Sequence, residues 1–185
     1  MSFIRNDLEN ALSDMEILAK AHGIAPFEVY LMGGSGCILA RYIDRATRDF
    51  DIVDLEYSAS LGRVLKVLEP YDMIDPQMAI LSSTYKSRST RLAQFEYLQI
   101  YVLAREDIII SKLGRLNQRD IDDIKTMLPE SDMELVVRLA EEVVANNLST
   151  KAKTVFCKNL SVLLEDCHVQ NHVQQLEELC RRFRQ

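Results

Sequence analysis

One stretch constrains the fold of this chain more than any other, because it joins two predicted strands through a glycine-rich turn and a helix. It runs from Leu31 to Asp54 and reads LMGGSGCILARYIDRATRDFDIVD. The pattern predicts a turn at 33–36, a helix over 37–43 and a second strand over 50–55. This spacing leaves room for one helix and a return into an adjacent strand. We therefore expect the turn and the second strand to lie close together.

The glycine turn predicts a binding site for phosphate. Gly33 and Gly34 lack a Cβ, so the backbone there can come close to a ligand. The helix that follows directs N–H groups and a partial positive charge at the same point, and the Ser35 hydroxyl can donate to a phosphate oxygen. The alternative interpretation is a plain strand-to-helix turn in which Ser35 is the N-cap.

Two aspartates of the second strand predict a metal site. Residues two apart in a strand share a face, so Asp49 and Asp51 are expected to point together while Phe50 and Ile52 enter the core. Two carboxylates about 4 Å apart repel by roughly 4 kcal/mol at an effective dielectric near 20. A divalent cation removes that repulsion, and Mg²⁺ prefers oxygen ligands. A solvated strand edge is the alternative.

Composition narrows the class of protein. A net charge of −6 argues against an extensive nucleic-acid binder, because such proteins are usually basic, although Arg41, Arg45 and Arg48 form a local basic cluster. No apolar run approaches the roughly 20 residues that cross a bilayer, and the start of the chain lacks the pattern of a signal peptide. The spacing of the four cysteines favours reduced thiols. We expect a cytoplasmic protein with no membrane partner.

The rest of the chain predicts an α+β part followed by a helical part. Further helices are predicted over 4–19, 61–68, 106–112 and 119–128, and further strands over 28–32, 78–81 and 97–103. After Pro129 the pattern is helical throughout, near 131–144, 151–164 and 168–183. The predicted fold class is therefore a small mixed β-sheet flanked by helices, with a C-terminal helical extension. The predicted domains are residues 1–128 and 129–185.

In this order, the glycine turn, the short helix and the Asp-x-Asp strand resemble the nucleotidyltransferase superfamily, which has a polymerase-β-like fold. Within it, the chain is similar to the branch of the AbiEii and MenT toxins of bacterial toxin–antitoxin systems. Two later segments extend the likeness. Tyr101–Leu113 is similar to that branch's strand, acidic pair and Lys-Leu helix, and Arg119–Ile124 to its Arg-Asp segment. The resemblance covers about residues 28 to 128.

The resemblance implies a role for each motif residue. The implied nucleotide-binding residues are Gly33, Gly34, Ser35, Arg48, Lys112 and Asp120; the implied catalytic residues are Asp49, Asp51 and Lys112, of which the two aspartates bind Mg²⁺. Lys112 would neutralise phosphate charge or position the nucleotide, and Asp120 would orient the nucleotide or Lys112. From the residues alone, Lys112 is more typical of a surface lysine, and Asp120 is more typical of a carboxylate at a helix start.

One part of the superfamily pattern is not identified in the sequence. Active members generally carry a third carboxylate on a neighbouring strand, which helps to deprotonate the acceptor hydroxyl. The predicted strand over 78–81 contains no acid, and Asp54 has the wrong parity to join the Asp-x-Asp pair. Asp75 and Glu96 are the available candidates.

The leading hypothesis is an enzyme that moves a nucleoside monophosphate from a nucleoside triphosphate to an acceptor hydroxyl, with Mg²⁺ as cofactor. By the resemblance, the acceptor is a tRNA 3′ end and an antitoxin protein is a partner. The first alternative is a module of the same fold that binds a nucleotide or a partner with weak or no turnover. The second is a transferase for a small hydroxylated molecule such as an aminoglycoside.

Overall fold

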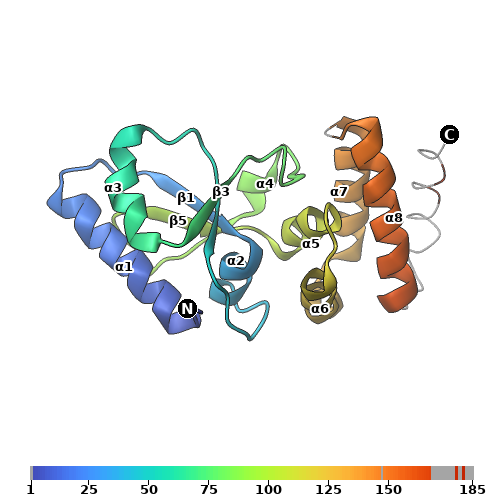
Figure 1. The fold of residues 1–185 in the computed structure, drawn as a ribbon, viewed down its shortest axis with the longest axis horizontal. Coiled ribbons are helices and arrows are strands. Elements are labelled where there is room, and N and C mark those ends of the chain that lie inside the picture. Colours follow the sequence, from blue (N-terminus) through green and yellow to red (C-terminus); the bar gives the residue numbers. More distant parts are fainter. Residues whose placement is uncertain (1, 147, 168–177, 179–180, 182–185) are drawn as a thin grey trace. The chain divides into compact units, whose positions relative to one another are not determined.

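The structure is a computed structural model that describes residues 2–146, 148–167, 178 and 181. Its contacts divide the chain into two compact units (Figure 1). Unit 1 comprises Met1–Pro76 and Lys86–Ala104, and unit 2 comprises Gln77–Tyr85 and Arg105–Gln185. The chain therefore passes from one unit to the other three times, and the segment 77–85 belongs to the second unit although it connects two strands of the first.

Unit 1 contains a five-stranded mixed sheet of order β3-β2-β1-β5-β4. The strands are β1 (Glu28–Met32), β2 (Phe50–Val53), β3 (Tyr71–Ile74), β4 (Thr90–Arg91) and β5 (Gln99–Val102). Strand β1 pairs parallel with β5 and antiparallel with β2, while β2 pairs parallel with β3 and β4 pairs antiparallel with β5. Together with the flanking helices, this mixed sheet confirms the predicted fold class.

Helices complete unit 1. They are α1 (Arg5–Ala21), α2 (Gly33–Leu39), the 3₁₀ turn η1 (Ala59–Leu61), α3 (Gly62–Leu65) and the 3₁₀ turn η2 (Lys66–Leu68), while α4 (Tyr85–Arg88) crosses the division between the units. Helix α1 forms because Leu8, Leu12, Met15 and Ala19 recur at helical spacing and are 0% exposed. It packs against α2 and α3, and α2 packs on β1, β2 and β5.

The register of the sheet decides which side chains share a face. Leu31 pairs with Ile52, and both are 0% exposed in the core. Met32 pairs with Asp51, so Asp51 lies on the opposite face from Ile52. The two faces are thus an apolar one that builds the core and a second one that carries the predicted metal-binding acid.

Two predicted elements are placed differently by the structure. The strand expected over 78–81 is absent, and the strand in this region is β3, seven residues earlier at Tyr71–Ile74. The helix expected over 37–43 begins earlier, at Gly33, because that glycine takes a φ of +56° and turns the chain directly into the helix. The glycine turn is therefore the first turn of α2 itself.

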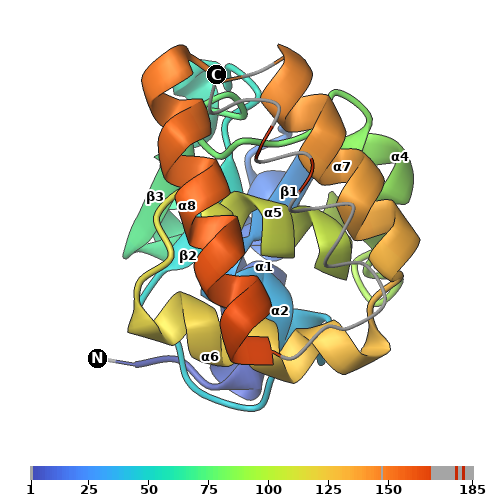
Figure 2. The same ribbon diagram turned by 90° about the vertical axis from the view of Figure 1, so that its right-hand side faces the viewer.

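Unit 2 is helical. Its elements are α5 (Arg105–Leu113), α6 (Gln118–Met127), the 3₁₀ turn η3 (Leu128–Glu130), α7 (Met133–Asn146) and α8 (Thr150–Cys167). Helix α5 packs against α6, α7 and α8 (Figure 2). In the division by contacts, α5 and α6 belong to the same unit as the C-terminal helices. The domain bounds from the sequence, 1–128 and 129–185, stay a prediction. The predicted helix 168–183 lies outside the continuous described residues.

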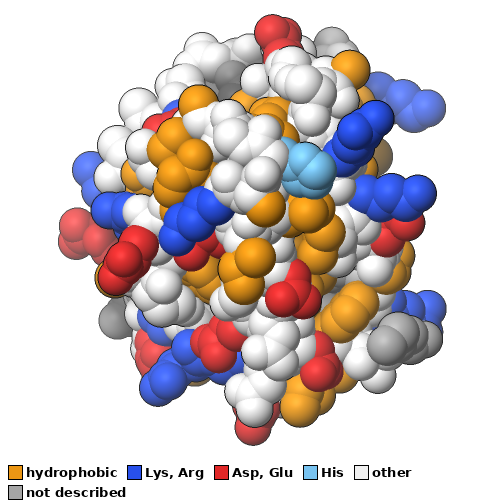
Figure 3. Space-filling model, turned by 90° about the vertical axis from the view of Figure 1, so that its left-hand side faces the viewer, with side chains coloured by type: hydrophobic (Ala, Val, Ile, Leu, Met, Phe, Trp, Pro, Cys, Tyr) orange, Lys and Arg blue, Asp and Glu red, His pale blue; other side chains and the backbone are white. Residues whose placement is uncertain are grey.

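The described surface is mixed in character. Figure 3 shows one face on which apolar side chains are interspersed with acidic, basic and uncharged polar ones. Among the described residues, no helix combines the length and the apolar composition that crossing a membrane requires.

Candidate functional site

The segment 45–51 of unit 1 passes the glycine turn and bends at 45 and at 48–49 before β2 begins at Phe50. Arg45, Asp49 and Asp51 are half-buried and Thr47 is buried, whereas Ala46 and Arg48 at the even positions are exposed. Arg45, Thr47 and Asp51 pack against the turn. This segment thus brings a cation, a hydroxyl and a carboxylate to the start of α2.

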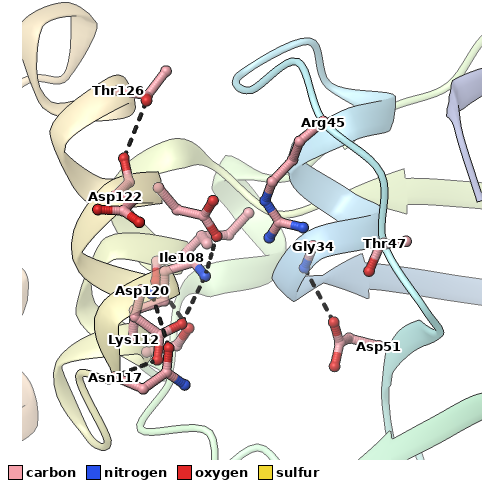
Figure 4. A network of polar contacts seen from close by, with 12 residues as sticks. Gly34, Arg45, Thr47, Asp51, Ile108, Lys112, Asn117, Asp120, Asp122 and Thr126 are labelled. Atoms are coloured by element: carbon pink, nitrogen blue, oxygen red, sulfur yellow. Dashed lines mark hydrogen bonds and ion pairs between the residues drawn. The ribbon is translucent and has the colours of Figure 1, made fainter. Parts of the chain in front are cut away.

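Both glycines are required by this close approach. A Cβ on Gly33 would lie 1.9 Å from Asp51 Oδ2, and a Cβ on Gly34 would lie 2.7 Å from Thr47 Oγ1. A side chain at either position would therefore force Asp51 or Thr47 to move. We call these residues, Gly33, Gly34, Arg45, Thr47 and Asp51, the glycine-turn cluster. Figure 4 shows this cluster, with the hydrogen bond from the Gly34 amide to Asp51.

Asp51 is tied to the turn through two hydrogen bonds. Its Oδ2 atom accepts a hydrogen bond from the Gly34 N–H at 3.1 Å, and its own N–H donates to Ser35 Oγ at 3.0 Å. The Ser35 hydroxyl donates in turn to Met32 O at 3.2 Å, and Ser35 is 0% exposed. Ser35 therefore links the end of β1 to β2, and its contact with a phosphate stays a prediction.

Asp49 precedes β2 and lies beside Thr47. The Thr47 hydroxyl is 3.4 Å from Asp49 Oδ1. Thr47 itself is held by the N-terminal segment, because its N–H donates to Phe3 O at 2.9 Å and its carbonyl accepts from Phe3 N at 2.6 Å. The ring of Phe3 also packs on Phe50, with 5.7 Å between centroids. The segment that carries both acids is thus fixed by backbone pairing on its outer side.

The structure supplies an acid that the sequence analysis missed. The parallel register pairs Asp51 with Asp72 of β3, so the two carboxylates leave the same face of the sheet on strands about 4.8 Å apart. Asp72 is exposed. Of the acids considered before, Asp75 follows the end of β3, and Glu96 lies in the loop before β5. The sequence signal for β3 is the segment Tyr71-Asp72-Met73-Ile74, in which one acid stands among apolar residues. The sequence analysis instead predicts the strand over 78–81, which contains no acid.

The residues present fit Mg²⁺ through two carboxylates rather than through a protein cage. Among the described residues, no group of three Asp, Glu, His or Cys side chains is gathered closely enough to hold a metal ion. Mg²⁺ is usually bound by one or two carboxylates together with substrate phosphates and water. Asp49 and Asp51, two residues apart in the chain, are the pair expected to provide such a partial set, and Asp72 lies beside Asp51 on the next strand.

Unit 2 contains the second polar group, built around Lys112 of α5. Its Nζ donates to Asp120 Oδ1 at 2.9 Å and to Asp123 Oδ2 at 2.7 Å, and the three side chains are 3%, 1% and 3% exposed. Arg115 Nε donates to Asp120 Oδ2 at 2.8 Å from a largely exposed position. We call these four residues the lysine cluster; Figure 4 shows Lys112 beside Asp120. Its two positive and two negative charges balance.

Pairing fixes the protonation states of Lys112 and Asp120. Burial by itself would lower the pKa of Lys112, but the hydrogen bonds and charges of Asp123 and Asp120 outweigh it and hold that pKa above its ordinary value. Burial would likewise raise the pKa of Asp120, but hydrogen bonds from Arg115 and Lys112 hold it below its ordinary value. Lys112 and Asp120 are therefore both charged at neutral pH.

The lysine cluster brings together two residues that the resemblance singled out. Lys112 and Asp120 form a direct ion pair, while Asp123 and Arg115 were not foreseen. Asp123 follows Asp120 by one helical turn on α6, so a shared helix face was the available signal. Contacts of Lys112 and Asp120 with a nucleotide stay predictions, as does a role for the exposed Arg48.

Comparison with known protein families gives a match over nearly the whole chain. Residues 6–183 match a family described as "Nucleotidyltransferase of unknown function (DUF6036)". Searches of curated proteins and of solved structures found no match.

Proposed function

Because the chain belongs to this family of nucleotidyltransferases, we propose that it transfers a nucleoside monophosphate from a nucleoside triphosphate to an acceptor hydroxyl. In this reaction the acceptor oxygen bonds to the α-phosphorus, the bond from that phosphorus to the bridging oxygen breaks, and pyrophosphate leaves. The proton of the hydroxyl passes to a carboxylate or to water. The observation that carries the proposal is the pairing of Asp51 with Asp72 on one sheet face, beside a turn that only glycine can form.

The proposed roles follow from position. Asp51 and Asp49 bind Mg²⁺, which when bound supplies positive charge that neutralises the phosphates. Asp72 is exposed on the same face as Asp51 and is the group that we propose accepts the proton of the acceptor hydroxyl. Gly33 and Gly34 let the side chains of Asp51 and Thr47 pack directly on the turn, and we propose that the triphosphate binds beside Asp51 rather than on the buried turn itself.

The alternative of an inactive binding module has less support from the structure than it has from the sequence. Its main support was the missing third carboxylate, and Asp72 now lies in register beside Asp51. For the acceptor, we extend the proposal to a tRNA 3′ end on the resemblance to toxin nucleotidyltransferases alone; control by an antitoxin rests on the same ground. The alternative acceptor is a small hydroxylated molecule such as an aminoglycoside, and a transfer assay with both acceptors distinguishes it from tRNA.

The test is a transfer assay with the purified full chain. Each labelled nucleoside triphosphate is incubated with Mg²⁺ and either total tRNA or an aminoglycoside, and label is followed into the acceptor. Asp49→Ala combined with Asp51→Ala should abolish transfer, whereas Asp54→Asn should leave it unchanged. Asp54 is the matched control because it follows the same strand and its Oδ1 accepts only a local turn hydrogen bond from Glu56 N that asparagine preserves. Transfer that survives the double change would refute the assigned metal site.

A further inference from the structure

We propose that Thr47 positions the Asp49 carboxylate for Mg²⁺, and that the N-terminal segment holds Thr47 in place through Phe3. The inference rests on the proposed function, in which Asp49 and Asp51 bind the metal ion. It gives a positioning role to two residues that the sequence analysis did not select. Both act through Asp49, and neither is proposed to touch the nucleotide.

The two acids of the metal site are held in different ways. Asp51 lies inside β2, where strand pairing and hydrogen bonds with Gly34 and Ser35 fix it. Asp49 lies in a bend directly before β2 begins at Phe50, and none of the described strand pairs includes it. The direction of the Asp49 side chain must therefore be set by a contact that the sheet does not supply.

Thr47 makes that contact. Its Oγ1 atom lies 3.4 Å from Asp49 Oδ1 and 3.5 Å from Asp49 O, and among the described residues it is the only hydrogen-bond partner of the Asp49 carboxylate. Because these distances exceed the usual ~2.5–3.0 Å of an O–H···O bond, the contact is weak. A single weak donor can set the direction of a carboxylate and still leave most of its lone pairs for a metal ion.

Thr47 can orient Asp49 because it is itself held on two sides. Its N–H donates to Phe3 O at 2.9 Å, and its carbonyl accepts from Phe3 N at 2.6 Å. Its side chain packs on the first turn of α2, where a Cβ on Gly34 would lie 2.7 Å from Thr47 Oγ1 (Figure 4). Thr47 is only 4% exposed. The N-terminal segment and α2 thus fix both its main chain and its side chain.

Phe3 is anchored by contacts of its own. Its ring packs on Phe50, with 5.7 Å between the centroids. The next residue, Ile4, donates its N–H to Asp7 Oδ2 at 2.9 Å, which ties the segment to the first turn of α1. The antiparallel bridge between Phe3 and Thr47 is an isolated one, outside the five-stranded sheet. A change in this bridge should therefore alter the metal site more than it alters the sheet.

The experiment measures metal binding without turnover. The full chain is titrated with Mn²⁺, which suits the same oxygen ligands as Mg²⁺, in the absence and in the presence of a nucleoside α,β-methylene triphosphate. Binding is followed by electron paramagnetic resonance. Thr47→Val keeps the shape of the side chain without its hydroxyl, and it should weaken Mn²⁺ binding between about twofold and tenfold, the effect of one hydrogen bond.

Two further variants separate the hydroxyl from the bridge. Thr47→Ser keeps the hydroxyl and should bind Mn²⁺ nearly as the wild-type chain does. Phe3→Pro removes the N–H that Thr47 O accepts and should weaken Mn²⁺ binding as well. Thr90→Val is the matched control, since Thr90 is an exposed threonine on β4 of the same unit. Thermal unfolding of each variant distinguishes a weaker metal site from a less stable fold.

The outcomes separate this inference from the proposed function. If Thr47→Val binds Mn²⁺ as the wild-type chain does, while Asp49→Ala combined with Asp51→Ala does not bind it, the positioning role is overturned and the metal site stands. A loss in Thr47→Val that Thr47→Ser shares would also overturn the role of the hydroxyl. A wild-type chain that binds no Mn²⁺ under either condition, or binding that survives the double change, would overturn the proposed function as well.

Discussion

The glycine-turn cluster of unit 1 and the lysine cluster of unit 2 are both built from oppositely charged side chains, yet their environments differ. In the lysine cluster, Lys112, Asp120 and Asp123 are almost completely buried and their charges are matched at 2.7–2.9 Å. In the glycine-turn cluster, Asp51 is half-buried, its carboxylate faces a backbone amide, and the next strand adds Asp72.

This difference separates a structural group from a site suited to a ligand. Buried charges must be paired where they stand, because an unpaired charge in the interior is strongly destabilising. Partly exposed carboxylates on one sheet face repel one another, and a bound cation relieves that repulsion. We therefore interpret the lysine cluster as a structural group that holds α6 against α5. We interpret the glycine-turn cluster as part of the proposed active site.

The largest effect is expected from Lys112→Met. It leaves Asp120 and Asp123 buried without their shared partner, which should lower the free energy of unfolding by about 3–5 kcal/mol. Chemical denaturation measures the change, with the exposed Lys151→Met as control. Adding Asp120→Asn and Asp123→Asn should recover part of the loss. A variant that stays fully stable but no longer binds nucleotide would instead give Lys112 the ligand-binding role that the resemblance implied.

Asp72→Asn should act on activity and not on stability. Asparagine has nearly the same shape but cannot accept the proton of the acceptor hydroxyl, so the transfer rate should fall about 100-fold or more, in the range of general-base catalysis. Because Asp72 is exposed, the free energy of unfolding should change by less than about 0.5 kcal/mol. If Asp75→Asn removed activity and Asp72→Asn did not, the third carboxylate would be Asp75.

Gly33→Ala should lower both the free energy of unfolding and the transfer activity. The left-handed φ of +56° is unfavourable for alanine by about 1–2 kcal/mol, and the new Cβ would meet Asp51 Oδ2 at 1.9 Å. We expect a lower unfolding free energy together with loss of transfer, since Asp51 must move. Gly62→Ala is the control, because a Cβ there meets nothing within 4 Å. Normal activity in Gly33→Ala would mean that the contact between Asp51 and the turn is dispensable.

The pH dependence of stability should be the smallest effect and should come from the lysine cluster. The pKa of Asp120 is lower in the folded chain than its ordinary 3.8, so its stabilisation is complete above that value and is lost as the pH falls through the folded pKa. The pKa of Lys112 is raised above 10.5, so its stabilisation is lost only as the pH rises through the higher folded value. Unfolding followed from neutral to acid pH should show a decline that Asp120→Asn makes shallower.

The sequence alone identified local patterns. It determined β1 to the residue, the strand that carries Asp51, the apolar stripe of α1 and the helical character of the second half, because strand and helix periodicity depends on neighbouring residues. Asp49 was expected in the same strand but lies in a bend before it. It also placed Gly33 and Gly34 at a turn where a side chain has no room. The likeness to nucleotidyltransferases came from the order of these motifs, and the family match agrees with it.

Only the tertiary structure decided which side chains meet. The pairing of Asp72 with Asp51 depends on the register of β3 against β2, which is set by contacts between segments about twenty residues apart and not by either segment's own pattern. The same holds for Arg45, whose place at Gly34 follows from how the loop returns to the turn, and for Asp123, which shares Lys112 only once α6 packs on α5. The periodicity of a segment predicts which face each side chain lies on. Which side chain of another segment it contacts is set by the packing of the two segments.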